Sequence, residues 1–372
     1  MQESVTITVS VPDRKLPLET ASVLSKEGIE WTLTNSAEVQ IELSDLLGTN
    51  WGANWGANCD DQNVLKVADS LESAGFSLRW RSFSRAANHH YKDKTESSRP
   101  FYNWPREPAV LAVVPHWQCE RWLGRCLRSL THQTHPLTNI VVIDDGSDVP
   151  PLEIVKAFAQ VTLLASPLSQ QVGPYRLVQS VIANTDYTAF LFQDADDWSV
   201  CDRLQTLLAT ARAHSADITG SQEIRVIEPE RCLQTVGYPV NVNAAMAHAP
   251  GHGLLHPTSL VTQHILQKVG GFATGLRFGA DSEFLLRAHW IARTVNSPRY
   301  CYFRRKRPKS LTTAQQTGLE SPERIKLTSK IKEKAIERAQ AIKNGERPDL
   351  SPLSVMPLIE LEHLLGPKLR WR

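Results

Sequence analysis

The chain has 372 residues, enough for two or three domains at roughly 100–200 residues each. Apolar residues make up 41% of it and charged residues 22%, a balance typical of globular proteins and unlike that of disordered chains. The 41 basic and 39 acidic side chains give a formal charge of +2, which argues against a nucleic-acid coat or a general binder of polyanions. Residues 304–372 nevertheless hold sixteen Lys or Arg against eight Asp or Glu, so we expect an anionic partner to contact this part.

The sequence carries no sign of a membrane span or of secretion. No apolar run approaches the roughly 20 residues that a membrane-spanning helix needs. Residues 1–4 lack the basic and apolar segments of a secretory signal. The six cysteines form no C-x-x-C pair and are expected to be reduced thiols. These features predict a cytoplasmic protein, and the basic C-terminal tail is a candidate for contact with the inner face of the membrane.

Residues 1–83 predict a small α+β domain. Apolar and polar residues alternate, or form short apolar runs, where strands are expected: at 5–11, 29–34, 39–43 and 76–83. Helices are expected over residues 18–26 and, capped by Asp60 or Asp61, up to residue 71. The resulting order β-α-β-β-α-β is that of a ferredoxin-like domain.

The next segments predict a linker and a larger α/β domain. Residues 84–108 are polar and contain three prolines, as linkers between domains often do. After them, short apolar runs without alternation are separated by helical segments; the runs are 109–114, 140–143, 161–164 and 189–192. Such runs are typical of a mainly parallel sheet that helices cover on both faces. We therefore predict this domain over residues 109–313.

Residues 314–372 predict a basic helical tail. The stretch 321–344 is rich in Lys, Glu, Arg and Ala, which are good helix formers. Prolines follow it, and a short terminal helix is expected over 358–365.

Two of the predicted strands end in acidic clusters. The sequence D-D-G-S follows the second run at 144–147, and Q-D-A-D-D follows the fourth at 193–197. In open α/β sheets, ligands bind at the carboxyl ends of the strands. Three carboxylates within four residues repel one another unless a positive charge lies among them, and Mg²⁺ or Mn²⁺ commonly bridge such carboxylates to substrate phosphates. The structural alternatives are helix capping by Asp197 and an ordinary turn at Gly146.

Several motifs in this order resemble the family 2 glycosyltransferases with the GT-A fold. They are V-V-P-H-W (113–117), I-V-V-I-D-D-G-S (140–147), F-L-F-Q-D-A-D-D (190–197), K-V-G-G-F (268–272) and F-G-A-D-S-E-F-L-L-R (278–287). The resemblance covers about residues 109–313. It implies a hexosyltransferase of glycan biosynthesis, which moves a sugar from a UDP- or GDP-linked donor with inversion. It also implies a divalent cation, Mn²⁺ or Mg²⁺, and an acceptor hydroxyl on a glycan, a lipid-linked sugar or a protein.

The resemblance assigns donor-binding roles by position. Pro115 ends the first strand beside the nucleobase, and Asp144 and Asp145 match the acidic pair that contacts base and ribose. Asp194 and Asp196 match the D-x-D motif, both of them candidate metal ligands, with Asp194 also near the ribose.

The catalytic base implied by the resemblance is Asp281, which would deprotonate the acceptor hydroxyl. Glu283 is a nearby competitor, and capping of a helix is the structural alternative for Asp281. Several residues depart from the family pattern: Ala280 stands where the family has an acid, Trp117 where it has Tyr, and Gln118, Gln171 and Gln179 where it has Asn. The three glutamines motivate the alternative of a degenerate module that binds a glycan or a nucleotide without turnover.

The basic run R-R-K-R-P-K-S at 304–310 corresponds to a basic loop of the family. It is a candidate to close over the donor diphosphate or to contact anionic lipid or the acceptor, and a solvated loop is equally expected. His256, just before an expected strand over 257–261, is a candidate for a metal or donor role near the acceptor side.

Overall fold

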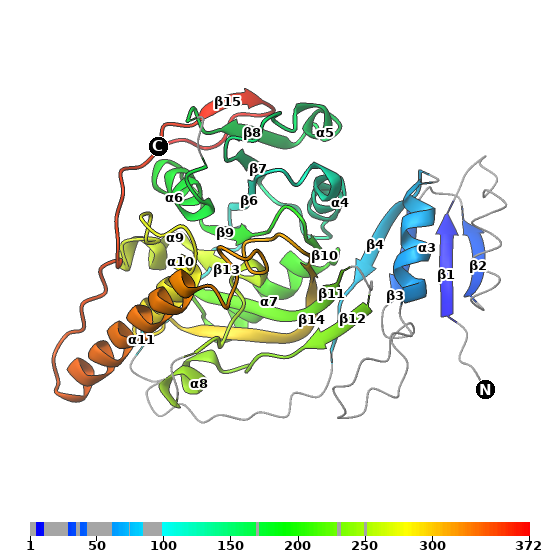
Figure 1. The fold of residues 1–372 in the computed structure, drawn as a ribbon. Coiled ribbons are helices and arrows are strands. Elements are labelled where there is room, and N and C mark those ends of the chain that lie inside the picture. The colour runs from blue at the N-terminus through cyan, green and yellow to red at the C-terminus, as the bar shows by residue number, and fades with distance from the viewer. Residues whose placement is uncertain are drawn as a thin grey trace.

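The computed structural model describes residues 5–10, 29–34, 38–42, 62–73, 75–84, 99–168, 171–228, 232–248 and 251–372. Two sheets organise these residues, a smaller one of four strands and a larger one of eleven (Figure 1). Among the described residues, no helix is long and apolar enough to cross a membrane.

The smaller sheet lies beside the larger one (Figure 1). Its elements are β1 (Val5–Ser10), β2 (Ile29–Thr34), β3 (Glu38–Glu42), α3 (Gln62–Ser73) and β4 (Ser77–Arg81). They confirm the four predicted strands and the second predicted helix, while the helix expected over 18–26 lies outside the described residues. The strand order is β2-β1-β3-β4, with β1 parallel to β2 and β3 parallel to β4. Because the members of each parallel pair are neighbours, the split βαβ arrangement of a ferredoxin-like domain is not formed.

The larger sheet has a parallel centre of four strands. They are β6 (Val110–His116), β7 (Asn139–Asp144), β8 (Val161–Ala165) and β9 (Ala189–Phe192), in the order β9-β6-β7-β8. These are the four apolar runs of the sequence, so the predicted parallel centre is confirmed. Along β6, Val110, Ala112 and Val114 face one core and Leu111 and Val113 face the other. Both faces are buried, which explains why the run is continuously apolar.

Helices cover both faces of this centre (Figure 1). One core contains side chains from α4 (Glu120–Thr131), α5 (Leu152–Lys156) and α7 (Arg203–His214). The other contains side chains from α6 (Pro174–Asn184), α8 (Val242–His248), α9 (Gln263–Lys268) and α10 (Ala280–Ala288).

The sheet continues beyond β9 with mixed pairing, through β13, β11, β14 and β10. The bounds are β10 (Trp198–Ser199), β11 (Ile218–Ile227), β12 (Cys232–Val236), β13 (Leu260–Thr262) and β14 (Thr294–Lys306), with a 3-10 turn, η2 (His256–Thr258). β14 runs parallel to β11 and antiparallel to β10. Its carboxyl end therefore brings the basic run beside the acidic cluster that precedes β10.

The described part of the predicted linker packs on the larger domain. β5 (Phe83–Ser84) pairs with β14. The indole Nε1 of Trp104 donates to the carbonyl of Ala216 at 2.9 Å, and Arg99 Nε donates to the carbonyl of His289 at 3.2 Å. The division at 83/84, 108/109 and 313/314 stays a prediction.

The C-terminal region contains α11 (Pro322–Lys343), as predicted, but not the second predicted helix. Residues 358–361 have no regular secondary structure, and β15 (Glu362–Leu365) pairs antiparallel with β8. The segment is too short to nucleate a helix by itself, and the edge of β8 offers it a row of backbone partners. Gly366, at φ 89°, then lies so close to β8 that a Cβ would be 2.0 Å from the carbonyl oxygen of Val161.

Four cysteines, at 119, 126, 201 and 301, are free and buried. Cys232 is in a disulfide, so the prediction that all six are reduced is wrong for this residue.

A buried ion pair joins α10, a neighbouring turn and the C-terminal region. Arg287 donates to Glu283 through Nε at 2.7 Å and through Nη2 at 2.8 Å, and the two side chains are 0% and 1% exposed. Arg287 also donates to the carbonyls of Gly271 (2.6 Å) and Leu350 (3.1 Å). Glu283 accepts from the backbone N–H of Leu353 at 3.1 Å. The ion pair between Glu283 and Arg287 therefore holds together α10, the turn at Gly271 and the C-terminal segment near Leu353.

We expect Arg287→Met to destabilise the protein by about 3–5 kcal/mol, because the substitution leaves the Glu283 carboxylate buried without its partner. The exposed pair Lys334–Glu337 on α11 is the matched control, and Lys334→Ala is expected to cost less than about 1 kcal/mol. Urea unfolding of both variants measures the difference. Equal losses would contradict the role assigned to the buried pair.

Candidate functional site

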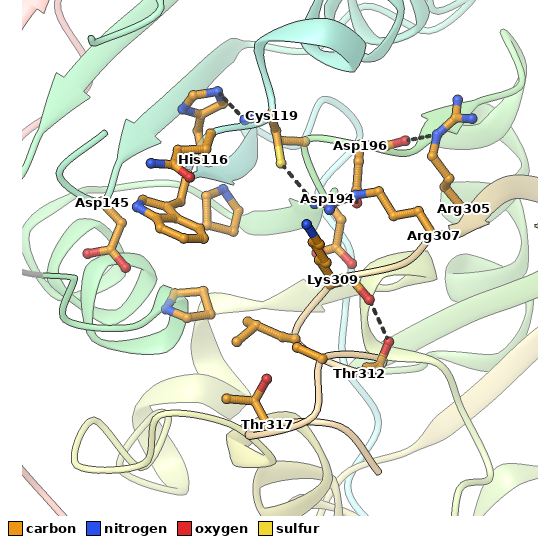
Figure 2. A pocket seen from close by; sticks show the side chains of 18 of the residues that line it. His116, Cys119, Asp145, Asp194, Asp196, Arg305, Arg307, Lys309, Thr312 and Thr317 are labelled. Atoms are coloured by element: carbon orange, nitrogen blue, oxygen red, sulfur yellow. Dashed lines mark hydrogen bonds and ion pairs between the residues drawn. The ribbon is translucent and has the colours of Figure 1, made fainter. Parts of the chain in front are cut away.

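A cavity of about 840 Å³ opens at the carboxyl ends of β6, β7 and β9 (Figure 2). Its charged lining residues are Asp145, Asp194, Asp196, Asp197, Arg277, Arg304, Arg305, Arg307 and Lys309. Pro115 lines it as well. Asp145 lies on one side, and Asp194, Asp196 and Arg307 lie on the other (Figure 2). Four of the predicted donor-binding residues thus share one cavity, but neither Asp144 nor Asp281 lines it.

Asp144 is a buried structural residue rather than part of the cavity wall. Its carboxylate accepts from Ser147 Oγ at 2.6 Å and from the Ser147 backbone N–H at 3.0 Å, and it lies 2.8 Å from His116 Nδ1. Burial would raise the pKa of Asp144, but the bonds with His116 and Ser147 outweigh it and hold this pKa below its usual value.

His116 is an organising residue that the sequence did not single out. Its Nε2 accepts from the backbone N–H of Cys119 at 3.3 Å, so the hydrogen-bond pattern assigns the proton to Nδ1, which donates to Asp144. A lone histidine after a strand carries no sequence signal that distinguishes this role from ordinary core packing.

Asp145 is the member of the acidic pair that faces the cavity (Figure 2). Its two oxygens accept from the backbone N–H groups of Val172 (2.8 Å) and Gly173 (2.9 Å), where α6 begins. Burial raises the pKa of Asp145 to about 6. Each oxygen keeps a lone pair, so the carboxylate can still accept from a ligand.

The backbone of the acidic turn after β9 is fixed by β14. The backbone N–H of Asp194 donates to Tyr302 Oη at 3.0 Å. The backbone N–H of Arg305 donates to the buried carboxylate of Asp197 at 2.6 Å. Asp196 accepts from Arg305 Nε through its carbonyl (3.0 Å) and from Arg307 Nε through its carboxylate (2.7 Å).

Asp194 differs from its two neighbours, since its carboxylate opens on the cavity and accepts no hydrogen bond from any described residue. The surrounding protein, and then the charge of Asp196, raise the pKa of Asp194 to about 7. Burial and the negative charges of Asp196 and Asp194 also raise the pKa of Asp197. The cluster is therefore electrostatically strained when every carboxylate is ionised.

A second residue that the sequence did not reveal is Arg203, which is fully buried beneath this turn. Its Nη1 donates to Gln193 Oε1 and Ser199 Oγ, each at 2.9 Å, and its Nη2 donates to the carbonyls of Phe192 (2.9 Å) and Pro257 (2.8 Å). Burial lowers the pKa of Arg203 to about 10. The guanidinium thus fixes the end of β9 from behind the cavity.

Asp281 lines a second cavity of about 390 Å³, which shares Arg304 and Thr312 with the first. It stands in the first turn of α10, whose N-cap is Gly279. Glu283, the competitor, faces the core, where both of its oxygens bond to Arg287.

His256 lines the second cavity but packs as a core residue. Its ring centroid lies 4.2 Å from that of Phe192 and 5.2 Å from that of Phe272. Burial lowers the pKa of His256 to about 4, so the ring is neutral at physiological pH.

Two of the residues that depart from the family pattern have structural partners. Gln179 Oε1 accepts from the backbone N–H of Phe272 at 2.9 Å, which links α6 to the turn that Arg287 also contacts. The backbone N–H of Gln118 donates to Ser147 Oγ at 3.1 Å. Gln171 lines the first cavity.

The residues present fit a cation that is shared with a ligand. Among the described residues, no group of three or more His, Cys, Asp or Glu could enclose a metal ion. Asp194 and Asp196 both line the cavity, however, and Mg²⁺ is usually held by one or two carboxylates together with substrate phosphates and water. A cation at Asp196 would compete with Arg307 for the same carboxylate.

Comparison with known proteins gives a family match over part of the chain and several relatives of partial length. Residues 111–251 match the family model described as Glycosyl transferase family 2. Glycosyltransferase GlyA of Streptococcus pneumoniae is 29% identical over 110 residues, which are 29% of this chain and 16% of that protein. An uncharacterized glycosyltransferase of Haemophilus influenzae is 28% identical over 105 residues, 27% of this chain and 41% of that protein. The chain thus spans less than half the length of these relatives.

Among solved structures, S. aureus TarS residues 1–349 in complex with UDP is similar, with a TM-score of 0.45 and 20% identity over 54% of this chain and 61% of that chain. The same TarS fragment in complex with UDP-GlcNAc has a TM-score of 0.45 and 22% identity over 54% and 60%. The family match confirms the resemblance to family 2 glycosyltransferases and, with the mixed α/β sheet, the predicted fold class.

We expect Asp194→Asn to raise the thermal midpoint of the cation-free protein by roughly 2–4 °C, the effect on a domain of 150–250 residues of the roughly 1 kcal/mol that is left after solvent screens this exposed carboxylate. The pKa of Asp194 lies above its unfolded value, so its ionisation destabilises the folded state above pH 7 and has no such effect below pH 4. Calorimetry in EDTA should therefore show a larger gain in thermal midpoint at pH 8 than at pH 5. The control is Asp186→Asn, which removes an exposed charge. A lower thermal midpoint in Asp194→Asn, or the same gain in the control variant, would contradict the electrostatic strain assigned to the carboxylate cluster.

Proposed function

We propose that this protein is an inverting glycosyltransferase, which moves a sugar from a UDP- or GDP-linked donor to an acceptor hydroxyl by single displacement. The observation that carries the proposal is the first cavity, in which four Asp side chains meet five Arg or Lys side chains. A nucleoside diphosphate has a neutral nucleoside and a charged diphosphate, and the cavity offers partners for both.

The nucleoside end is assigned to Pro115 and Asp145. The carboxylate of Asp145 is held by backbone groups and keeps accepting capacity for donors on the base or the ribose. Asp144 contributes indirectly, because its bonds with His116 and Ser147 set the shape of the loop after β7.

The diphosphate end is assigned to the opposite wall, where the basic residues from the end of β14 gather around Asp194 and Asp196. A Mn²⁺ or Mg²⁺ ion held by these two carboxylates would stabilise the negative charge that develops on the leaving diphosphate. Arg304, Arg307 and Lys309 line the same space and supply fixed positive charge for the same purpose.

Asp281 is proposed as the general base. Asp281 lines the adjoining cavity, which shares Arg304 and Thr312 with the donor cavity. An acceptor bound in the adjoining cavity would therefore lie next to the donor sugar without displacing the diphosphate. The carboxylate would take the proton from the acceptor hydroxyl as the new bond forms. Glu283 is unsuited to this role, because its carboxylate is 1% exposed, faces the core and is paired with Arg287.

The acceptor hydroxyl is placed on a glycan, a lipid-linked sugar or a protein. The cytoplasmic location and the contact of the basic tail with a membrane remain predictions.

We expect one of UDP and GDP to bind in calorimetric titrations with Mn²⁺, and Asp196→Ala to remove the difference between Mn²⁺ and EDTA. The control is Glu153→Gln, an exposed acid on α5. Equal affinity of the wild type with and without Mn²⁺ would exclude the metal role. Failure of both nucleotides to bind would overturn the proposal and favour a module without turnover.

We expect Asp281→Asn to lower the rate of transfer by roughly 10²–10⁴, the range for loss of a general base, and to change the affinity for the donor nucleotide by less than about twofold. Release of the nucleotide from its sugar conjugate, with acceptor present, measures the rate. Glu323→Gln, an exposed acid at the start of α11, should leave the rate unchanged. Parallel losses of rate and binding would assign Asp281 to the donor site instead.

A further inference from the structure

The second cavity is strongly basic. Its charged lining residues are Arg225, Arg304, Lys306, Arg324, Lys332 and Asp281. We propose that this cavity binds an acceptor that carries an anionic group, a phosphate or a carboxylate, near its reactive hydroxyl. The inference rests on the proposed function, because it treats the cavity beside Asp281 as the acceptor site.

Part of the positive charge is already compensated within the protein. The buried carboxylate of Glu223 lies 2.5 Å from Arg225 Nη2 and 3.7 Å from Arg304 Nη1. Among the described residues, neither Lys306, Arg324 nor Lys332 forms an ion pair. Asp281 and Glu223 are the acids beside five basic side chains, and Arg304 also lies near Asp197 and Asp194 of the first cavity, so the excess of positive charge comes from Lys306, Arg324 and Lys332.

Two of the uncompensated groups, Lys306 and Arg324, are partly buried, whereas Lys332 is exposed at the rim of the cavity. Arg324 Nη2 donates to the carbonyl of Leu311 at 3.1 Å, and its guanidinium lies 4.5 Å from the ring centroid of Phe278. Arg324 Nε is buried and has no hydrogen-bond partner. Burial and the neighbouring Arg304 and Arg225 lower the pKa of Lys306. Positive groups held together in this way are stabilised when a bound anion pairs with them.

This charge does not belong to the donor site. Lys306, Arg324 and Lys332 line the second cavity and not the first, whereas Arg304 lines both. Arg324 and Lys332 come from α11, which packs on α10 beside Asp281. The apolar wall of the same cavity includes Phe278, Leu327 and Ile331, surfaces suited to the carbon face of a sugar or polyol.

The test compares charged and neutral probes of the same size in the full chain. Glycerol 3-phosphate is paired with glycerol, and galacturonate with galactose, and each is titrated by ligand-observed NMR. Saturating UDP or GDP, whichever binds, with Mn²⁺ fills the first cavity, so that remaining anion binding reports the second. We expect at least one charged probe to bind about tenfold more tightly than its neutral partner, the effect of roughly one charge-assisted hydrogen bond.

The double variant Arg324→Gln/Lys332→Gln should remove this preference and leave the neutral probes unchanged. The matched control is Lys326→Gln/Lys330→Gln, which removes the same charge from exposed positions of α11 outside the cavity. A preference for the phosphate probe alone supports a phosphate-bearing acceptor, and a preference for the carboxylate probe alone supports a uronate-bearing one.

Equal binding of charged and neutral probes, or equal losses in the test and control variants, would overturn the inference. Nucleotide binding in the same samples separates this failure from that of the proposed function. If a nucleotide binds and no charged probe is preferred, only the anionic acceptor is refuted. If neither nucleotide binds, the proposed function is refuted, and the inference that rests on it is refuted as well.

Discussion

The main constraint on this structure is that positive charge must offset the repulsion among three carboxylates. The chain places these carboxylates within four residues at the end of β9. Taken out of bulk water, such a cluster is unstable without nearby positive charge. The positive charge comes from the end of β14, where Arg305 is 108 residues after Asp197 in the chain. Arg305 bonds to the turn through its backbone and side chain, and Arg307 pairs with Asp196. The pairing of β14 with β10 is thus a condition for the site to exist.

The charge balance also explains why the two cavities adjoin. The basic run leaves the sheet at the end of β14, and Arg304 lines both cavities while its neighbours divide between them. Arg305 and Arg307 face the acidic turn, whereas Lys306 faces the opposite space. Because successive residues of a strand point to opposite sides, one strand end supplies positive charge to two sites.

The C-terminal region is part of the same construction. The pair between Glu283 and Arg287 connects α10 to the chain after α11, and β15 adds a strand beside β8. Ile359 and Leu369 are buried in the core that α6 and α10 share. A segment that looks like a solvated basic tail in the sequence therefore forms a wall of the cavity that contains Asp281.

The parallel centre of the sheet and the two acidic strand ends could be predicted from the amino-acid sequence, because they are local patterns of apolar residues and carboxylates. The sequence could not decide which of Asp144 and Asp145 faces the cavity, since that depends on the bonds that His116 and Ser147 make with one of them. Nor could it separate Asp281 from Glu283, or reveal Arg203, which joins the end of β9 to the carbonyl of Pro257. These roles follow from the folded structure, because the set of groups that is buried beside a charged side chain, and their geometry, is not a local property of the sequence.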